Sequence, residues 1–170
     1  LERMMAFLDF SLLKPRLHRW KFNLRTGKTI EEDICDETIE FGVINQHIAG
    51  IEHQYTYSMI PTEGHFTFDG ITKHDHQKNS LSKYIFPEHV FISEVSFAPK
   101  TGAIDEDDGY LVTISNDVKE KSSSCLLFDA KSIEFGPVCE IPLPHQICSG
   151  TVLGVAVTCL VLVSREGKKA

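Results

Sequence analysis

The sequence predicts an all-β fold built from antiparallel strands. In several short runs an apolar residue recurs at every second position, as in half-buried strands. Stretches rich in Gly, Pro, Asp and Asn, which favour turns, separate these runs. Apart from the first dozen residues, no stretch carries the apolar stripe of an amphipathic helix.

The first expected strand is 17–24, where Trp20, Phe22 and Leu24 alternate with polar residues. A turn follows at 25–28, in which Gly27 can adopt a positive φ. Further strands are expected at 38–44, 54–59, 66–73, 89–97, 109–115, 125–129 and 138–141. Many short strands build a β-sandwich or a β-propeller, and this pattern alone leaves both open.

Composition narrows the classes of function. The 170 residues carry a net charge of −7, which argues against a nucleic-acid-binding surface. The five cysteines contain no C-x-x-C pair, so we expect isolated buried thiols and no zinc site. The apolar run 152–163 is shorter than the roughly 20 residues that span a bilayer, so no transmembrane helix is expected.

Several segments, in order along the chain, resemble the C-terminal third of the carotenoid-cleavage oxygenases. Residues 40–45 read E-F-G-V-I-N, where that family has E-F-P-x-I-N, and residues 106–111 read E-D-D-G-Y-L, as in the family. The other matching segments are L-H-R-W-K-F-N-L-R-T-G (17–27), G-I-T-K-H-D (70–75), S-E-V-S-F-A-P-K (93–100), L-L-F-D-A-K (126–131) and I-P-L-P-H (141–145). One such match is weak evidence, whereas the ordered set is specific.

The resemblance implies a fold, a cofactor and a reaction. It implies consecutive blades of a seven-bladed β-propeller in which four histidines hold Fe(II) on the axis. Carboxylates then accept hydrogen bonds from the iron-bound imidazoles and orient them. The reaction is that of a dioxygenase, in which O₂ cleaves a conjugated double bond of a carotenoid, apocarotenoid or stilbene.

By this resemblance Glu40 and Glu94 match two of the supporting carboxylates. Taken without it, each is more simply a solvent-facing glutamate on a strand. The iron ligands themselves are not matched. Three belong to family segments upstream of the matching region, and Val152 stands where the fourth, in a G-F-H-G segment, is expected. We therefore expect no catalytic or metal-binding residue in this chain.

These matches divide the chain into three parts: an N-terminal segment 1–16, a partial propeller 17–150 and an apolar tail 151–170 outside the family pattern. We expect a fragment of an Fe(II) oxygenase that is inactive alone. The alternative is a non-catalytic truncated product that acts at most as an interaction module; an unrelated β-sandwich is a third, weaker possibility. A polyene or stilbene substrate, O₂ and peripheral membrane contact belong to the intact protein, in the cytoplasm or a plastid.

Two polar clusters offer alternative metal sites. His74 and His76 would face the same side of a strand and could form a metal pair, although solvated turn histidines are the better interpretation. The acidic run Asp105–Asp108 lacks the alternating D-x-D-x-D-G pattern of a calcium loop, so we expect a solvated turn there.

Overall fold

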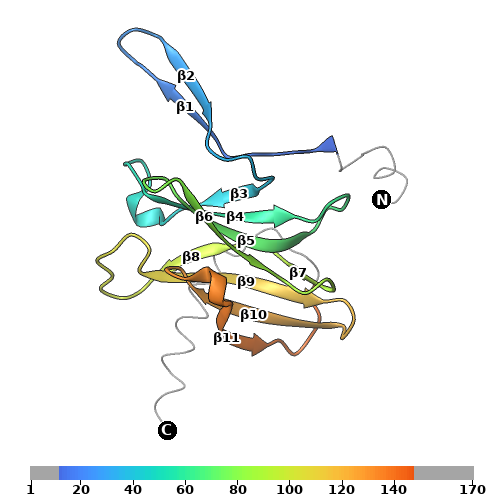
Figure 1. Ribbon diagram of the computed structural model, residues 1–170. Helices are drawn as coiled ribbons and strands as arrows, with labels where there is room; N and C mark the ends of the chain where they lie inside the picture. The colour runs from blue at the N-terminus through green and yellow to red at the C-terminus, as the bar shows by residue number, and fades with distance from the viewer. Residues whose placement is uncertain (1–11, 148–170) are drawn as a thin grey trace.

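The computed structural model describes residues 12–147, and within them the fold is all-β, as predicted. β1 (His18–Phe22) and β2 (Thr29–Asp33) form a two-stranded hairpin that projects away from the rest (Figure 1). The other nine strands form one hydrogen-bonded sheet system, and every pairing is antiparallel. They are β3 (Glu40–Val43), β4 (Tyr55–Pro61), β5 (Phe68–Asp75), β6 (Ser80–Ile85), β7 (Val90–Ile92), β8 (Ser96–Pro99), β9 (Gly109–Asp117), β10 (Ser122–Asp129) and β11 (Pro137–Pro142).

The pairing divides these strands into two four-stranded units. In the first blade β3, β4, β5 and β6 follow one another in chain order, each paired with the next. In the second blade β8, β9, β10 and β11 do the same. β7 lies in line with β8 along β9, and its Ile92 also pairs with Phe68 of β5, which joins the two blades. This is the expected arrangement of consecutive antiparallel blades.

The main hydrophobic core lies between the two blades. Tyr57, Met59 and Ile71 of the first blade pack with Leu111 and Phe128 of the second. These side chains are almost fully buried, which gives each blade one face that is removed from water. A smaller cluster of Ala98, Val112 and Cys125 covers the opposite face of the second blade.

Two strands escaped prediction. β2 reads T-I-E-E-D and β6 reads S-L-S-K-Y-I, and neither shows a clean apolar alternation. Both lie at the margin of their sheet and are fixed by backbone pairing with one neighbour, to which β6 adds the packing of Tyr84 against Phe86 and Phe128 of the main core. The segment expected as one strand at 89–97 is divided into β7 and β8.

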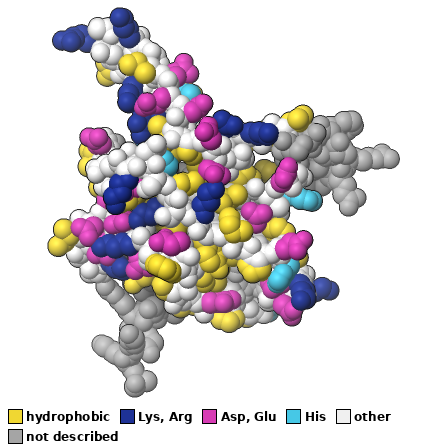
Figure 2. All heavy atoms as spheres, in the orientation of Figure 1, with side chains coloured by type: hydrophobic (Ala, Val, Ile, Leu, Met, Phe, Trp, Pro, Cys, Tyr) yellow, Lys and Arg dark blue, Asp and Glu magenta, His cyan; other side chains and the backbone are white. Residues whose placement is uncertain are grey.

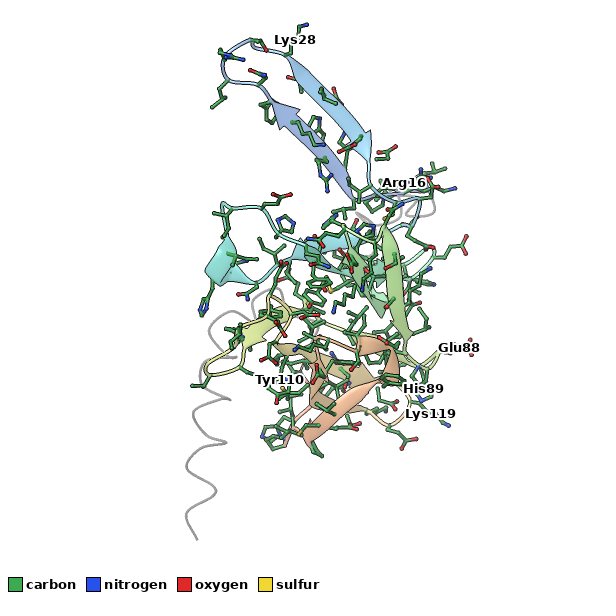
Figure 3. The ribbon with its side chains drawn as sticks, turned by 60° about the vertical axis from the view of Figure 1, so that its left-hand side comes forward. Arg16, Lys28, Glu88, His89, Tyr110 and Lys119 are labelled. Atoms are coloured by element: carbon green, nitrogen blue, oxygen red, sulfur yellow. The ribbon has the colours of Figure 1, made fainter. Side chains whose placement is uncertain are left out.

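The predicted turn at 25–28 is confirmed. Gly27 has a φ of 70° and donates its N–H to Asn23 O, while the Asn23 side chain accepts from the N–H groups of Arg25 and Thr26. The turn ends the hairpin at its far tip, beside Lys28 (Figure 3). The expectation of buried thiols holds for Cys125 and is wrong for the exposed Cys139. No helix within residues 12–147 is long and apolar enough to cross a membrane.

Close packing at the start of β9 leads to a first prediction. A Cβ at Gly109 would lie 2.5 Å from Phe97 Cζ and 2.7 Å from the carbonyl oxygen of Ala98. Gly109→Ala should therefore force β8 and β9 apart and lower the free energy of unfolding by about 1–3 kcal/mol, measured by urea denaturation. Gly42→Ala is the control and should cost less, because its Cβ would lie 3.3 Å from the Thr56 methyl group and 3.6 Å from Ser58 Oγ. Equal losses would contradict the packing argument.

Candidate functional site

Glu40 and Glu94 occupy matching places in the two blades. Glu40 begins β3, the first strand of the first blade, and Glu94 lies just before β8, the first strand of the second. Both blades are built in chain order, so both carboxylates belong to the strand at the same edge of their blade. The structure thus shows that the two glutamates occupy equivalent places in their blades, which their spacing in the sequence does not reveal.

A β-bulge accompanies each glutamate. Glu40 and Val43 pair with Met59 and Tyr57, so two residues of β3 lie opposite the single Ser58 of β4. Phe41, inside this bulge, has a φ of 50°, which is strained for a residue with a side chain. Bulges redirect side chains and are common beside functional sites.

In the second blade the bulge contains the glutamate itself. Ile92 and Ser96 pair with Ser115 and Val112, so Ser93, Glu94 and Val95 lie opposite only two residues of β9. Ser93 and Val95 are buried, whereas Glu94 is partly exposed. The extra residue therefore turns the carboxylate out of the packed sheet.

Neither carboxylate is held by the surrounding chain. Within residues 12–147, no hydrogen bond or ion pair involves the carboxylate of Glu40 or of Glu94, and both residues are partly buried. A partly buried carboxylate without a partner is available to accept a hydrogen bond from an imidazole N–H of another segment. Glu40 also borders a groove of about 250 Å³, whose apolar wall includes Leu13, Pro61, Phe66 and Phe68.

The acidic loop Asp105–Asp108 is tied to the surrounding protein by ion pairs and hydrogen bonds. Each of its four acids has a protein partner: Asp105 binds Lys131, Asp107 binds Lys73 and Asp108 binds Lys100. The Glu106 carboxylate accepts the backbone N–H groups of Gln54 and Tyr55 at 2.7–2.9 Å. The expectation of a solvated turn holds for Asp105, whose side chain is 65% exposed, and is wrong for Glu106 and Asp107, whose partners come from segments far away in sequence.

The pair Lys73–Asp107 lies deepest in this network. The Nζ–Oδ2 distance is 2.6 Å, and the side chains are only 9% and 13% exposed. Lys73 Nζ also donates to the carbonyl oxygen of Lys131 and lies 4.2 Å from the centre of the Tyr55 ring. Burial, followed by the charge of Asp107, raises the pKa of Tyr55. Because Lys73 belongs to β5 and Asp107 precedes β9, the pair joins the two blades.

Of the two histidines singled out by their spacing, His74 is buried and His76 is partly exposed. His74 is 3% exposed, and its ring centre lies 4.6 Å from that of His76. The interpretation of both as solvated turn residues is therefore wrong for His74. Nor do they form a metal site with a third residue: the part of the chain that the structure describes contains no group of three His, Cys, Asp or Glu side chains able to hold a metal ion.

Comparison with known proteins identifies the family. The family profile for retinal pigment epithelial membrane protein matches residues 2–151, nearly the whole chain. The chain belongs to this family, the carotenoid-cleavage oxygenases. The resemblance seen in the ordered motifs is thereby confirmed, and the match also includes the residues before 17.

Curated relatives from plants and bacteria agree. The chain is 28% identical over 148 residues to carotenoid 9,10(9',10')-cleavage dioxygenase 1 of Phaseolus vulgaris, which covers 79% of this chain and 27% of that protein. It is 28% identical over 144 residues to the carotenoid cleavage oxygenase of Mycobacterium tuberculosis, and the match covers 81% of this chain and 28% of that protein. An isoeugenol monooxygenase of Pseudomonas putida is 22% identical over 151 residues, and the match covers 82% of this chain and 32% of that protein. The chain thus spans about a third or less of the length of these relatives.

Solved structures show the same fold. A variant of the Synechocystis apocarotenoid oxygenase superposes with a TM-score of 0.78 at 23% identity, covering 85% of this chain and 31% of that one. The cobalt-substituted form of that enzyme gives the same score and coverage. The all-β, antiparallel propeller-blade fold predicted from the sequence is therefore confirmed. Val152, predicted at the place of an iron ligand, lies outside the described residues.

The buried ion pair leads to a second prediction. Lys73→Met leaves the Asp107 carboxylate buried without its cation, which should lower the free energy of unfolding by about 3–5 kcal/mol. Urea denaturation followed by circular dichroism measures the loss. The control is Lys131→Met, which removes a half-exposed lysine that follows β10 and pairs with Asp105 of the same loop, and it should change stability little. A similar loss in both variants would show that burial of the pair is not what matters.

Proposed function

We propose that this chain is part of an Fe(II)-dependent dioxygenase that cleaves a conjugated double bond of a carotenoid, apocarotenoid or stilbene. One observation supports this most directly: two unpartnered carboxylates, Glu40 and Glu94, lie at bulges on the first strands of successive blades. In this proposal they accept hydrogen bonds from two iron-bound histidines and so fix the tautomer and direction of each ring.

An iron ion would need ligands from other parts of the protein as well as the residues described here. The described residues supply no ligand set for iron, so the histidines come from other parts of the protein in this proposal. When bound, iron supplies the redox chemistry that O₂ activation requires. A structural neighbour, the Synechocystis apocarotenoid oxygenase, was solved in a cobalt-substituted form, which supports a metal centre in that protein.

The hairpin suggests how the rest of a propeller would join. In both complete blades the chain runs from the first strand to the fourth without leaving the blade. By the same order, β1 and β2, which directly precede the first blade, would be the last two strands of a preceding one. We propose that its first two strands come from outside the described residues and pair along the open edge of β1. Their packing would cover Trp20 and Phe22, which are 54% and 68% exposed here.

Those same exposed surfaces favour a second candidate, a non-catalytic interaction module. Trp20, Phe22, Leu24 and Ile30 leave apolar area on a two-stranded ribbon, which is marginally stable by itself. β3 and β11 end the sheet with unpaired backbone groups. A chain acting alone would therefore associate through these edges, whatever its chemistry.

The third prediction concerns the chain alone. After anaerobic loading with Fe(II) and desalting, the 170-residue protein should retain no stoichiometric iron and should not cleave a carotenoid or stilbene in air. Iron content by plasma emission and product formation by chromatography measure this. Stoichiometric iron with oxygen-dependent cleavage would overturn the proposal that the ligands come from other parts of the protein.

The fourth prediction tests the two glutamates in a complete enzyme. Residues 17–147 would replace the matching segment of the Synechocystis apocarotenoid oxygenase, which keeps its own histidines and C-terminal end. In this chimera Glu40→Gln and Glu94→Gln should each lower iron affinity or activity about 10–100-fold, because an amide is a weaker partner for an imidazole N–H. Glu134→Gln, an exposed glutamate of the short helix Ile133–Phe135, is the control.

The outcomes of this experiment separate two failures. If the unaltered chimera binds iron and cleaves its substrate but neither glutamate variant differs from Glu134→Gln, the assignment of Glu40 and Glu94 is wrong. If the chimera folds, judged by circular dichroism, yet binds no iron, the segment does not support the metal centre at all.

A further inference from the structure

The bulge of β3 decides on which side of its strand Glu40 lies. Glu40 pairs with Met59 of β4, and Val43 pairs with Tyr57. Met59 and Tyr57 are two residues apart, so they share a face of β4, and both belong to the main core between the blades. Glu40 and Val43 are three residues apart, and a regular strand would place them on opposite faces. The extra residue of the bulge therefore puts Glu40 on the side of its blade that faces the second blade.

Val43 fixes the register of β3 beyond the bulge. Its side chain packs against the main core, and a slip of one residue would turn it away from that core. If the bulge were lost while Val43 kept its place, Glu40 would move to the opposite face of the strand, the face of Ser58 on β4. A single extra residue thus separates the two possible directions of the carboxylate.

The backbone of Phe41 makes this bulge possible. Its φ of 50° lies in the left-handed region, where the Cβ of a bulky residue is crowded. Among the described residues other than glycine, only Asn79 and Lys121 also have a positive φ, and both lie in turns between strands. Phe41 adopts this conformation inside a strand. Such strain costs free energy, so the surrounding structure has to offset it.

The ring of Phe41 makes a contact that can offset this cost. It meets the ring of Phe68 edge to face, with ring centres 5.6 Å apart and an angle of 84° between the planes. Phe68 begins β5, pairs with Pro61 of β4 and Ile92 of β7, and packs against the main core, so its ring offers a fixed surface. Phe41 itself stays 49% exposed, so burial alone offers little compensation.

We propose that Phe41 is a positioning residue for Glu40. Its ring, docked on Phe68, holds the left-handed backbone of the bulge and so keeps the carboxylate on the side that faces the second blade. This inference rests on the proposed function, in which the Glu40 carboxylate accepts a hydrogen bond from an iron-bound imidazole. In this role Phe41 acts only through the direction of Glu40, without touching the metal. The bulge at Glu94 contains no residue with a positive φ, so the device belongs to the first blade.

Two substitutions of Phe41 separate backbone strain from loss of the ring. Both remove the ring, but glycine adopts a positive φ freely, whereas alanine keeps the strain. Urea denaturation of the 170-residue chain should therefore give a higher midpoint for Phe41→Gly than for Phe41→Ala. Phe91 of β7, which has no positive φ, is the control: there glycine should give the lower midpoint, as is usual in a strand. Alanine above glycine at both positions would overturn the proposal.

The effect on Glu40 is measured in the chimera with the Synechocystis oxygenase, as anaerobic Fe(II) affinity against a competing chelator. Phe41→Ala should weaken iron binding nearly as much as Glu40→Gln, about 10–100-fold. Phe41→Gly, which can keep the bulge, should stay within about threefold of the unaltered chimera. Combining Phe41→Ala with Glu40→Gln should add little to either loss, because one acts through the other.

The outcomes distinguish this inference from the proposed function. If Glu40→Gln weakens iron binding but Phe41→Ala does not, or if glycine is as harmful as alanine, the positioning role is wrong. It is also wrong if Phe41→Ala lowers cleavage activity with iron affinity unchanged, because the ring then acts on the substrate. A chimera that folds but binds no iron, or whose iron affinity is indifferent to Glu40→Gln, would instead refute the proposed function, and the role of Phe41 falls with it.

Discussion

The ion pair between Lys73 and Asp107 is the interaction on which the two-blade arrangement depends most. It places one charge of each sign in the core between the blades, where an unpaired charge would be costly. The rest of the acidic loop Asp105–Asp108 surrounds it with further ties to both blades. Figure 2 shows positive and negative side chains interspersed on the face viewed, in keeping with a protein whose charges are used mainly in pairs. The loop thereby fixes how one blade sits on the next.

The fixed position of one blade against the next also sets where Glu40 and Glu94 lie relative to each other. Glu40 and Glu94 are separated by more than fifty residues in the chain, yet Glu40 begins the first strand of its blade beside a one-residue bulge, and Glu94 lies within such a bulge just before the first strand of the next blade. A regular ladder would direct a carboxylate either into the packed face or out to water. A bulge provides a third direction, and the same device in both blades is what a site shared between blades requires. In the proposed site the blades position the two carboxylates, and histidines of another segment donate hydrogen bonds to them.

The hairpin meets the sheet through a different kind of interaction. No ion pair within the described residues joins its strands to the sheet, and Arg19 Nη2 instead donates a hydrogen bond to His76 Nδ1. The core between the blades is thus joined by a buried ion pair, whereas the junction with the hairpin is not. A protein assembled from similar blades can in this way have junctions of unequal strength, set by a few polar side chains.

The sequence by itself determined the strand-rich, antiparallel class, the turn at Gly27 and, through its ordered motifs, the family. These features are local, because alternation and turn chemistry act over a few residues. Tertiary structure decided β2 and β6, which pairing with a neighbour stabilises although their own pattern is weak. It also decided the burial of His74 and the partners of every acid in the loop Asp105–Asp108. Those contacts join residues 30 or more positions apart in several cases, and no local pattern records which distant group will remove a charge from water.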